Sequence, residues 1–254
     1  MNLEKLLSEI SAIAKVAGAE AMEIYATDFA IYDKADKSPV TEADERVEAV
    51  ILPRLAELTP DIPVISEEAA AAGHIPDVDA RFWLVDPLDG TKEFIKRNGE
   101  FTVNIALVEQ GRPVLGVVYA PALDRLFRGA QGVGAYLEQG GVCRPITCRQ
   151  VPAAGLTVVG SRSHGDPEAM DRFLAGRTVV EQKSAGSSLK FCLVAAGEAD
   201  LYPRLGRTME WDTAAGHAVL LAAGGSVNTL EGAALLYGKP GLDNPHFVAA
   251  GAVA

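Results

Sequence analysis

The spacing of apolar residues near the start of the chain predicts two amphipathic helices. Apolar side chains recur every three or four positions over residues 3–26, and a second helical pattern covers residues 41–58. Thr41, followed three positions later by Asp44, has the form of a capping box. We therefore expect the second helix to open at Thr41 and residues 37–40 to form a loop before it.

Short apolar runs after these helices predict strands of an antiparallel sheet. The runs cover residues 64–66, 82–85, 102–109 and 114–120, with residues 110–113 as a hairpin turn. From about residue 150 strands alternate with helices: strands at 156–160, 178–182, 201–202 and 225–227, and helices at 167–174, 187–196 and 211–223. We expect an N-terminal α+β lobe (1–145) and a C-terminal α/β lobe (146–254) that form one compact unit.

Composition and charge limit the classes of function. With 254 residues and 48% hydrophobic composition, the chain can bury a substantial core. A net charge of −11 argues against a protein that coats a nucleic acid polymer, which requires an extended basic surface. An anionic substrate would need bound metal cations or a few basic residues gathered in one cleft.

The pattern of apolar residues also limits where in the cell the protein can be expected. No apolar run approaches the roughly 20 residues of a membrane-spanning helix, and the N-terminal pattern is not that of a secretion signal. We expect a soluble, cytoplasmic protein and leave open a peripheral association with the cytoplasmic face of the inner membrane. The cysteines Cys143, Cys148 and Cys192 lack the paired spacings of a zinc ribbon or a disulfide framework, so buried reduced thiols are expected.

Two acids stand at the end of a predicted strand, in the segment from Trp83 to Thr91. Asp86 and Asp89 lie three positions apart, with a proline and a glycine beside them. Proline fixes the backbone and glycine permits a sharp exit, so both carboxylates can point to one place. An acidic turn without a function has the same composition, and this segment alone does not decide between the two.

Further acids follow the same pattern. Glu67 and Glu68 come directly after a short strand, and Asp212 opens an apolar helix. A solvated surface charge is the alternative for Glu68, and a helix cap is the alternative for Asp212. If Glu67 and Asp212 converge with Asp86 and Asp89, divalent cations are needed to neutralise the repulsion, and such hard oxygen ligands suit magnesium. Magnesium ions at such a site hold a phosphate ester and activate water.

These motifs resemble those of the lithium-sensitive, magnesium-dependent phosphatases of the inositol monophosphatase and fructose-1,6-bisphosphatase superfamily. The separated segments that agree in order and spacing are Glu67-Glu68, Asp86 to Thr91, and Trp211-Asp212. The CysQ-type 3'(2'),5'-bisphosphate nucleotidases are similar over more of the chain, through residues 38–41, 86–106, 160–164 and 186–191. The resemblance implies a layered sandwich (αβαβα) that combines α+β and α/β parts.

The resemblance also implies a set of site residues. The magnesium ligands, for two or three ions, would be Glu67, Asp86, the backbone carbonyl of Leu88, Asp89 and Asp212. Thr91 and Asp44 would orient and deprotonate the attacking water. The implied substrate contacts are Gly90, Thr91, Lys92, Ser161, His164, Gly186 and Lys190.

The implied reaction is removal of the 3'-phosphate of adenosine 3',5'-bisphosphate, or of the related 5'-phosphosulfate, by in-line attack of water. It yields AMP and phosphate in the case of the bisphosphate, without a covalent phosphoenzyme, and belongs to nucleotide recycling in sulfur assimilation. The wider family implies a homodimer. Another monoester, such as an inositol phosphate, fructose bisphosphate or histidinol phosphate, is the nearest alternative. A non-catalytic, metal-stabilised binding protein with this fold is the more distant one.

For several of these residues, an ordinary structural role is an alternative to a functional one. Thr91 can be a turn hydroxyl, and Asp44 an acid in the first turn of a helix. Lys190 can be a solvated lysine, and His164, in a polar loop, can simply be exposed. For His217, a packed or solvated histidine is favoured over a ligand.

A basic cluster follows the acidic turn. Lys92, Lys96 and Arg97 lie close together in the sequence and could hold a second phosphate of the substrate. The tail after Val227 carries no assignment.

Overall fold

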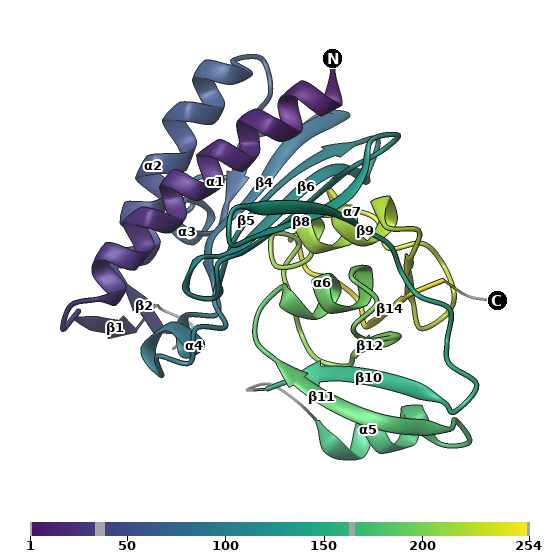
Figure 1. Cartoon of the computed structure of the whole chain (residues 1–254). Helices are drawn as coiled ribbons and strands as arrows, with labels where there is room; N and C mark the ends of the chain where they lie inside the picture. Colours follow the sequence, from purple (N-terminus) through teal and green to yellow (C-terminus); the bar gives the residue numbers. More distant parts are fainter. Residues whose placement is uncertain (1, 34–38, 163–165, 253–254) are drawn as a thin grey trace.

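The computed structural model describes residues 2–33, 39–162 and 166–252, which form two main sheets and a small hairpin (Figure 1). The hairpin pairs β1 (Ile31–Asp33) with β2 (Pro39–Thr41). The larger sheet has the order β3 (Val64–Ser66), β4 (Arg81–Asp89), β5 (Thr102–Glu109), β6 (Arg112–Ala120), β7 (Arg125–Ala130), β8 (Gly134–Gln139) and β9 (Val142–Ile146). The smaller sheet has the order β11 (Val179–Ala185), β10 (Leu156–Ser161), β12 (Leu201–Arg204), β14 (Phe247–Ala250) and β13 (Ser226–Thr229).

The helices separate and cover these sheets. They are α1 (Leu3–Tyr25), α2 (Glu42–Leu58), α3 (Glu67–Ala71), α4 (Thr91–Ile95), α5 (Pro167–Leu174), α6 (Leu189–Ala195) and α7 (Ala214–Ala222), with a short 3-10 helix at Pro121–Leu123. Helices α1 and α2 pack on one face of the larger sheet, α6 and α7 lie between the two sheets, and α5 covers the outer face of the smaller sheet (Figure 1). This succession of layers confirms the predicted αβαβα sandwich.

The two largest apolar clusters lie on opposite faces of the larger sheet. One joins α1 and α2 to the sheet, and the other joins the sheet to α6, α7 and the smaller sheet. Gly116 on β6 allows α7 to pack closely, because a Cβ atom there would lie 2.3 Å from the carbonyl oxygen of Ala215. This close approach fixes the position of the start of α7, where Asp212 stands.

Most sequence-predicted elements of the first half are confirmed. Helices α1 and α2 occupy the expected ranges, and the capping box of Thr41 and Asp44 is present. The loop expected over residues 37–40 is wrong at its end, because residues 39–41 pair with β1 as strand β2. The predicted antiparallel sheet holds for all neighbours except β3, which runs parallel to β4.

The cysteine prediction is confirmed in part. All three thiols are free, but only Cys192 is buried, Cys148 is half-buried and Cys143 is exposed. Cys143 is exposed because it lies on β9, the last strand of the larger sheet, where most side chains face solvent. No helix of the described residues is both long and apolar enough to cross a membrane.

Candidate active site

A pocket of about 840 Å³ opens where the larger sheet, α4, α6 and the segment before α7 meet. The predicted site residues that line it are Glu67, Asp86, Leu88, Asp89, Gly90, Thr91, Lys92, Ser161, Gly186, Lys190 and Asp212. Asp44 lies next to this set and contacts it through Thr91. His164 lies outside the described residues.

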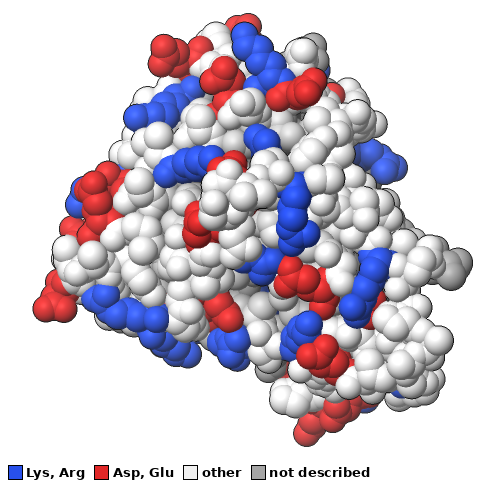
Figure 2. Space-filling view, viewed as in Figure 1, with Lys and Arg blue, Asp and Glu red and all other residues white. Residues whose placement is uncertain are grey.

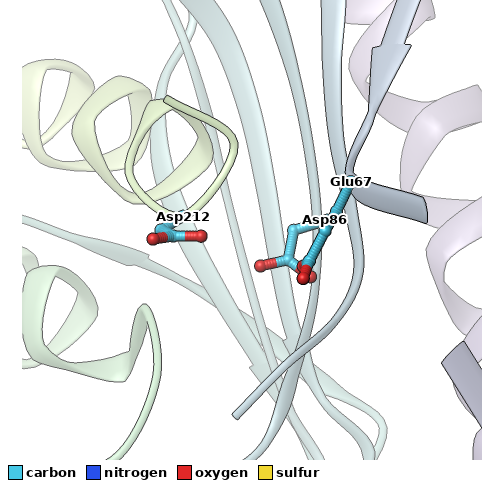
Figure 3. Close-up of side chains that lie close together, drawn as sticks. All are labelled: Glu67, Asp86 and Asp212. Atoms are coloured by element: carbon cyan, nitrogen blue, oxygen red, sulfur yellow. The ribbon is translucent and has the colours of Figure 1, made fainter. Parts of the chain in front are cut away.

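Three acids converge in this pocket from three separate elements (Figure 3). Glu67 begins α3 directly after β3, and Asp86 lies on β4, whose residue Val85 pairs in parallel register with Ser66. Asp212 reaches the same point from the loop that precedes α7. One carboxylate oxygen from each of the three acids lies within 4.8 Å of the others, a spacing at which they can share a metal ion.

The electrostatics of this cluster favour a bound cation. Burial raises the pKa of Asp86 well above its usual range, and the neighbouring charges of Glu67 and Asp89 raise it further. Asp86 Oδ2 is buried and has no hydrogen-bond partner among the described residues. Burial, together with the charges of Asp89 and Glu67, likewise raises the pKa of Asp212 to about 8. A hard divalent cation would remove these costs, so the donor set fits Mg²⁺.

Asp89 lines the same pocket but is not one of these three acids. Its Oδ2 atom accepts hydrogen bonds from the backbone of Ser188 at 2.7 Å and from Asn104 Nδ2 at 3.1 Å. The Ser188 hydroxyl donates to the carbonyl oxygen of Asp212 at 2.7 Å. Ser188 therefore links Asp89, at the end of β4, to Asp212, in the loop before α7.

Thr91 and Asp44 form the hydrogen bond expected of a water-activating pair. The Thr91 hydroxyl donates to Asp44 Oδ1 at 3.3 Å. The other oxygen of Asp44 accepts from the backbone and hydroxyl groups of Thr41 at 2.8 and 2.9 Å. Asp44 is buried, so the capping box that starts α2 also fixes this carboxylate behind Thr91.

Lys190 is a buried cation, so the solvated role left open for it is wrong. Its ammonium donates to the carbonyl oxygens of Ser187 at 2.6 Å and Ala185 at 3.3 Å, and its side chain lines the pocket. Burial lowers the pKa of Lys190 to about 8, although the charge of Asp89 opposes this shift. The lysine therefore places positive charge beside Asp89.

Gly186 lines the pocket, but its backbone N–H already has a partner. It donates to Glu100 Oε2 at 2.8 Å, and Glu100 is held in turn by the guanidinium of Arg162 at 2.7 and 2.8 Å. Glu100 and Arg162 therefore position the loop that leads into α6.

Two further expectations need correction. The Arg97 guanidinium donates to the carbonyl oxygens of Tyr25 and Thr27 and lies over the ring of Phe29, so this arginine anchors α4 to the end of α1. Of the predicted basic cluster, Lys92 lines the pocket. The helix-cap role left open for Asp212 is also wrong, because its carboxylate accepts from the Met209 backbone at 2.8 Å.

Other side chains were not anticipated from the sequence. Arg204, at the end of β12, lines the pocket, and its charge acts on Asp212. Asn104 orients Asp89 from β5, where an amide side chain among apolar neighbours was the available signal. His217 is buried and its Nδ1 atom lies 2.9 Å from the hydroxyl oxygen of Tyr237, which confirms a packed histidine.

The turn after Asp89 requires glycine, which gives a stability prediction. Gly90 has a φ of +93°, and a Cβ atom there would lie 2.2 Å from Ser187 Oγ. That hydroxyl oxygen lies 2.7 Å from the carbonyl oxygens of both Asp89 and Glu100, between which its one proton can be shared. Gly90→Ala should therefore lower the free energy of unfolding by the strain of about 1–2 kcal/mol for a left-handed residue plus about 1 kcal/mol for the lost hydrogen bond.

Gly73→Ala is the matched control, because Gly73 has a φ of +84° but no atom within 4 Å of an added Cβ. Urea unfolding of both variants measures the difference. Equal losses in the two variants would contradict the tight contact at Gly90.

Comparison with known proteins agrees with this geometry. The model of the inositol monophosphatase family matches residues 2–252. The chain is 52% identical to the 3'(2'),5'-bisphosphate nucleotidase CysQ of Salmonella typhimurium, over 91% of this chain and 94% of that protein. It is 34% identical to the protein of the same name from Haemophilus influenzae, over 98% of this chain and 93% of that protein.

Solved structures show the same likeness. CysQ from Bacteroides thetaiotaomicron is similar with a TM-score of 0.81 and 38% identity, over 97% of this chain and 98% of that one. An inositol monophosphatase from Anabaena is similar with a TM-score of 0.79 and 28% identity, over 99% of this chain and 92% of that one. The chain therefore belongs to the inositol monophosphatase family.

Proposed function

We propose that this protein is a 3'(2'),5'-bisphosphate nucleotidase, which removes the 3'-phosphate of adenosine 3',5'-bisphosphate to give AMP and phosphate. The observation that carries the proposal is the convergence of Glu67, Asp86 and Asp212 in a pocket that also contains the Thr91 hydroxyl. The 52% identity to a protein named as such a nucleotidase supports this substrate class.

The metal is proposed to be magnesium, as two or three ions. Glu67, Asp86 and Asp212 would hold it, together with Asp89 and the backbone carbonyl of Leu88. When bound, magnesium supplies positive charge that holds the phosphate and stabilises the charge developing on its oxygens. The high pKa of Asp86 and its unpartnered Oδ2 atom are the features that fit this cation.

The Thr91–Asp44 pair is proposed to handle the proton of the attacking water. The Thr91 hydroxyl donates to Asp44, which leaves a lone pair on Thr91 Oγ1 that can accept a hydrogen bond from water. As water attacks phosphorus, its proton passes through this hydroxyl to the Asp44 carboxylate, and the P–O3' bond breaks. The leaving 3'-oxygen takes up a proton from solvent, and free phosphate is released without a covalent intermediate.

The rest of the pocket is proposed to bind the nucleotide. Its volume of about 840 Å³ lies within the range of about 300–1,000 Å³ typical of small-molecule sites. Lys92, Lys190 and Arg204 supply positive charge around it, although the whole chain carries a net charge of −11. We assign Ser161, His164, Gly90 and Gly186 to further substrate contacts, and Ser161, Gly90 and Gly186 line the pocket.

The charge distribution on one face of the molecule suits a small substrate better than a nucleic acid polymer. On the face shown in Figure 2, basic and acidic side chains are interspersed, without an extended basic surface for a nucleic acid polymer. We also propose that the lobes predicted over residues 1–145 and 146–254 work as one catalytic unit, because both line the pocket. A homodimer, a cytoplasmic location and peripheral association with a membrane stay predictions.

Removal of the metal gives a direct test of this proposal. Purified protein with Mg²⁺ and adenosine 3',5'-bisphosphate is expected to release AMP and phosphate in equal amounts, measured by chromatography and a phosphate assay. EDTA should stop both, and excess Mg²⁺ should restore them. Release of adenosine 3'-phosphate in place of AMP, or release that persists in EDTA, would contradict the proposal.

A further inference from the structure

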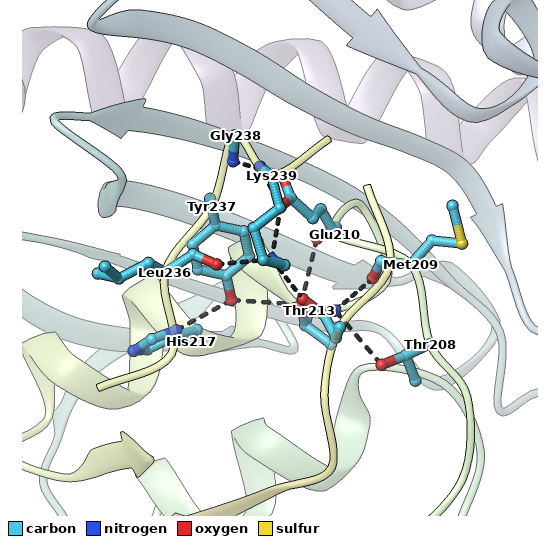
Figure 4. Close-up of polar contacts among 10 residues, drawn as sticks. Thr208, Met209, Glu210, Thr213, His217, Leu236, Tyr237, Gly238 and Lys239 are labelled. Atoms are coloured by element: carbon cyan, nitrogen blue, oxygen red, sulfur yellow. Dashed lines mark hydrogen bonds and ion pairs between the residues drawn. The ribbon is translucent and has the colours of Figure 1, made fainter. Parts of the chain in front are cut away.

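An ion pair with a buried carboxylate lies directly beside the loop that carries Asp212 (Figure 4). The Glu210 side chain is 0% exposed, and its carboxylate accepts from Lys239 Nζ at 2.5 Å. It also accepts from the backbone N–H groups of Gly238 at 2.7 Å and Lys239 at 3.0 Å. The segment 236–244, to which the sequence assigns no role, therefore wraps around Glu210; we call it the C-terminal clamp.

Lys239 links this carboxylate to the rest of the clamp. Besides Glu210, its ammonium donates to the carbonyl oxygen of Leu236 at 2.6 Å and to Asn244 Oδ1 at 3.2 Å. The three donors of the ammonium group thus have three partners. Lys239 therefore fixes both Glu210 and the side chain of Asn244.

Asn244 in turn holds the loop before α7. Its side-chain amide donates to the carbonyl oxygen of Met209 at 2.8 Å and to Thr213 Oγ1 at 3.0 Å. Its backbone N–H donates to the carbonyl oxygen of Thr208 at 2.9 Å. The clamp therefore contacts the loop on both sides of Asp212.

One peptide group connects the clamp to Asp212. The Thr208–Met209 peptide accepts from the Asn244 backbone at its oxygen, and at its nitrogen it donates to Asp212 Oδ2 at 2.8 Å. Hydrogen bonds at the two ends of one peptide polarise each other and fix its plane. The direction of this N–H group sets where the Asp212 carboxylate points.

The desolvation cost of the Glu210–Lys239 ion pair indicates that it has a role beyond stabilising the fold. The Glu210 carboxylate is fully buried and loses its hydration, whereas the Lys239 side chain is 30% exposed. Replacing a buried charge and its partner by apolar side chains of similar volume is often neutral or stabilising. Glu210 also adds a negative charge two positions from Asp212, which lines a pocket rich in carboxylates. The Lys239 ammonium neutralises the charge of the Glu210 carboxylate. Five hydrogen bonds, four donated by Lys239 and one by Gly238, hold Glu210 and the clamp together.

We propose that Glu210, Lys239 and Asn244 are positioning residues that hold Asp212 in its metal-binding orientation. The proposal rests on the proposed function only in taking Asp212 as a metal ligand. It does not depend on which phosphate ester is the substrate.

Lys239→Met tests the proposal because two effects on metal affinity have opposite signs. Removal of a positive charge near the acids would, through the electric field alone, strengthen cation binding. Loss of the positioning contacts should weaken it, by about tenfold, which is typical for residues that support a metal ligand. The affinity of purified protein for Mn²⁺, measured by titration calorimetry, and the Mg²⁺ concentration for half-maximal phosphate release should both shift to weaker binding.

Arg149→Met is the matched control. Arg149 likewise pairs a partly exposed cation with a buried carboxylate of the same half, with distances of 2.8 and 2.9 Å to Asp200, and neither residue lines the pocket. It should lower Tm without changing the Mn²⁺ affinity. Glu210→Gln, which keeps the shape of the side chain, should also weaken Mn²⁺ binding and serves if Lys239→Met does not fold.

The outcomes separate the two proposals. Unchanged or tighter Mn²⁺ binding in the folded Lys239 or Glu210 variant would overturn the positioning role, as would an equal loss of affinity in Arg149→Met. A wild-type protein that binds Mn²⁺ but does not hydrolyse adenosine 3',5'-bisphosphate would overturn the proposed substrate and leave this inference standing. A wild-type protein that binds no divalent cation would overturn both.

Discussion

Asp86→Asn is expected to lower kcat/KM for phosphate release at least about 100-fold while raising the Tm of the metal-free protein. The loss of activity follows because residues that merely support a metal ligand cost about 10–100-fold, and Asp86 is proposed as a ligand itself. The gain in stability follows because burial and the charge of Glu67 make an ionised Asp86 costly without a cation. A gain of about 1 kcal/mol corresponds to about 2–4 °C in a chain of this size.

Differential scanning fluorimetry in EDTA and steady-state kinetics in Mg²⁺ measure the two effects. Asp79→Asn makes the same chemical change at an exposed position shortly before β4 and should alter neither quantity. A metal-free Tm that falls in Asp86→Asn, or activity within a few-fold of wild type, would contradict the role assigned to this acid.

Asp44→Asn is expected to lower kcat by about 10²–10⁴-fold with little change in the affinity for Mg²⁺. General-base catalysis typically contributes a factor of this size, and an amide cannot take the proton that Thr91 passes on. The fold should persist, because the amide oxygen can still accept from the Thr41 backbone in the capping box. Thr91→Ala should give a comparable loss, since it interrupts the same hydrogen bond.

The measurement is kcat at saturating substrate and Mg²⁺, beside Tm. Glu42→Gln removes an exposed acid from the same first turn of α2 and controls for the helix dipole. Near-normal turnover in Asp44→Asn would exclude this carboxylate as the base. A large loss in Glu42→Gln would show that the charge of the helix terminus matters more than proton transfer.

The local setting of the metal-cluster acids was predictable from the sequence, whereas the ligand set followed from the family resemblance. The apolar run before Glu67 predicts where β3 ends, and the proline and glycine around Asp89 predict a turn, although β4 continues beyond the predicted run to Asp89. The capping box at Thr41 likewise predicted both the start of α2 and the fixed position of Asp44. In each case a local pattern sets the local geometry, whereas the convergence of Glu67, Asp86 and Asp212 depends on the packing of three separate elements.

The unpredicted features depend on contacts between distant segments. For Arg97 the sequence left open a contact with a second phosphate of the substrate or a solvated side chain, but the free carbonyl oxygens at the end of α1 bind its guanidinium instead. The sequence does not exclude a solvent-exposed Lys190. The side chain is buried because α6 packs between the two sheets. Glu210 gives no local sign that its partner lies 29 positions away, at Lys239.

One end of the larger sheet, formed by β7, β8 and β9, was not predicted from the sequence. No element was assigned to residues 121–149, which form β7, β8 and β9. Turns rich in glycine separate these strands, and β9 is largely exposed, so the apolar alternation that marks a strand is faint there. The exposure of Cys143 was missed for the same reason.

The most direct test of the central claim compares kcat/KM for adenosine 3',5'-bisphosphate with kcat/KM for inositol 1-phosphate and fructose 1,6-bisphosphate, in Mg²⁺ with and without lithium. A metal-dependent nucleotidase should prefer the nucleotide by a large factor and lose activity in lithium. A preference for inositol 1-phosphate or the sugar phosphate would contradict the substrate assignment and retain the metal chemistry. If no phosphate is released from any of the three substrates in Mg²⁺, the proposal that this protein is a phosphatase is contradicted.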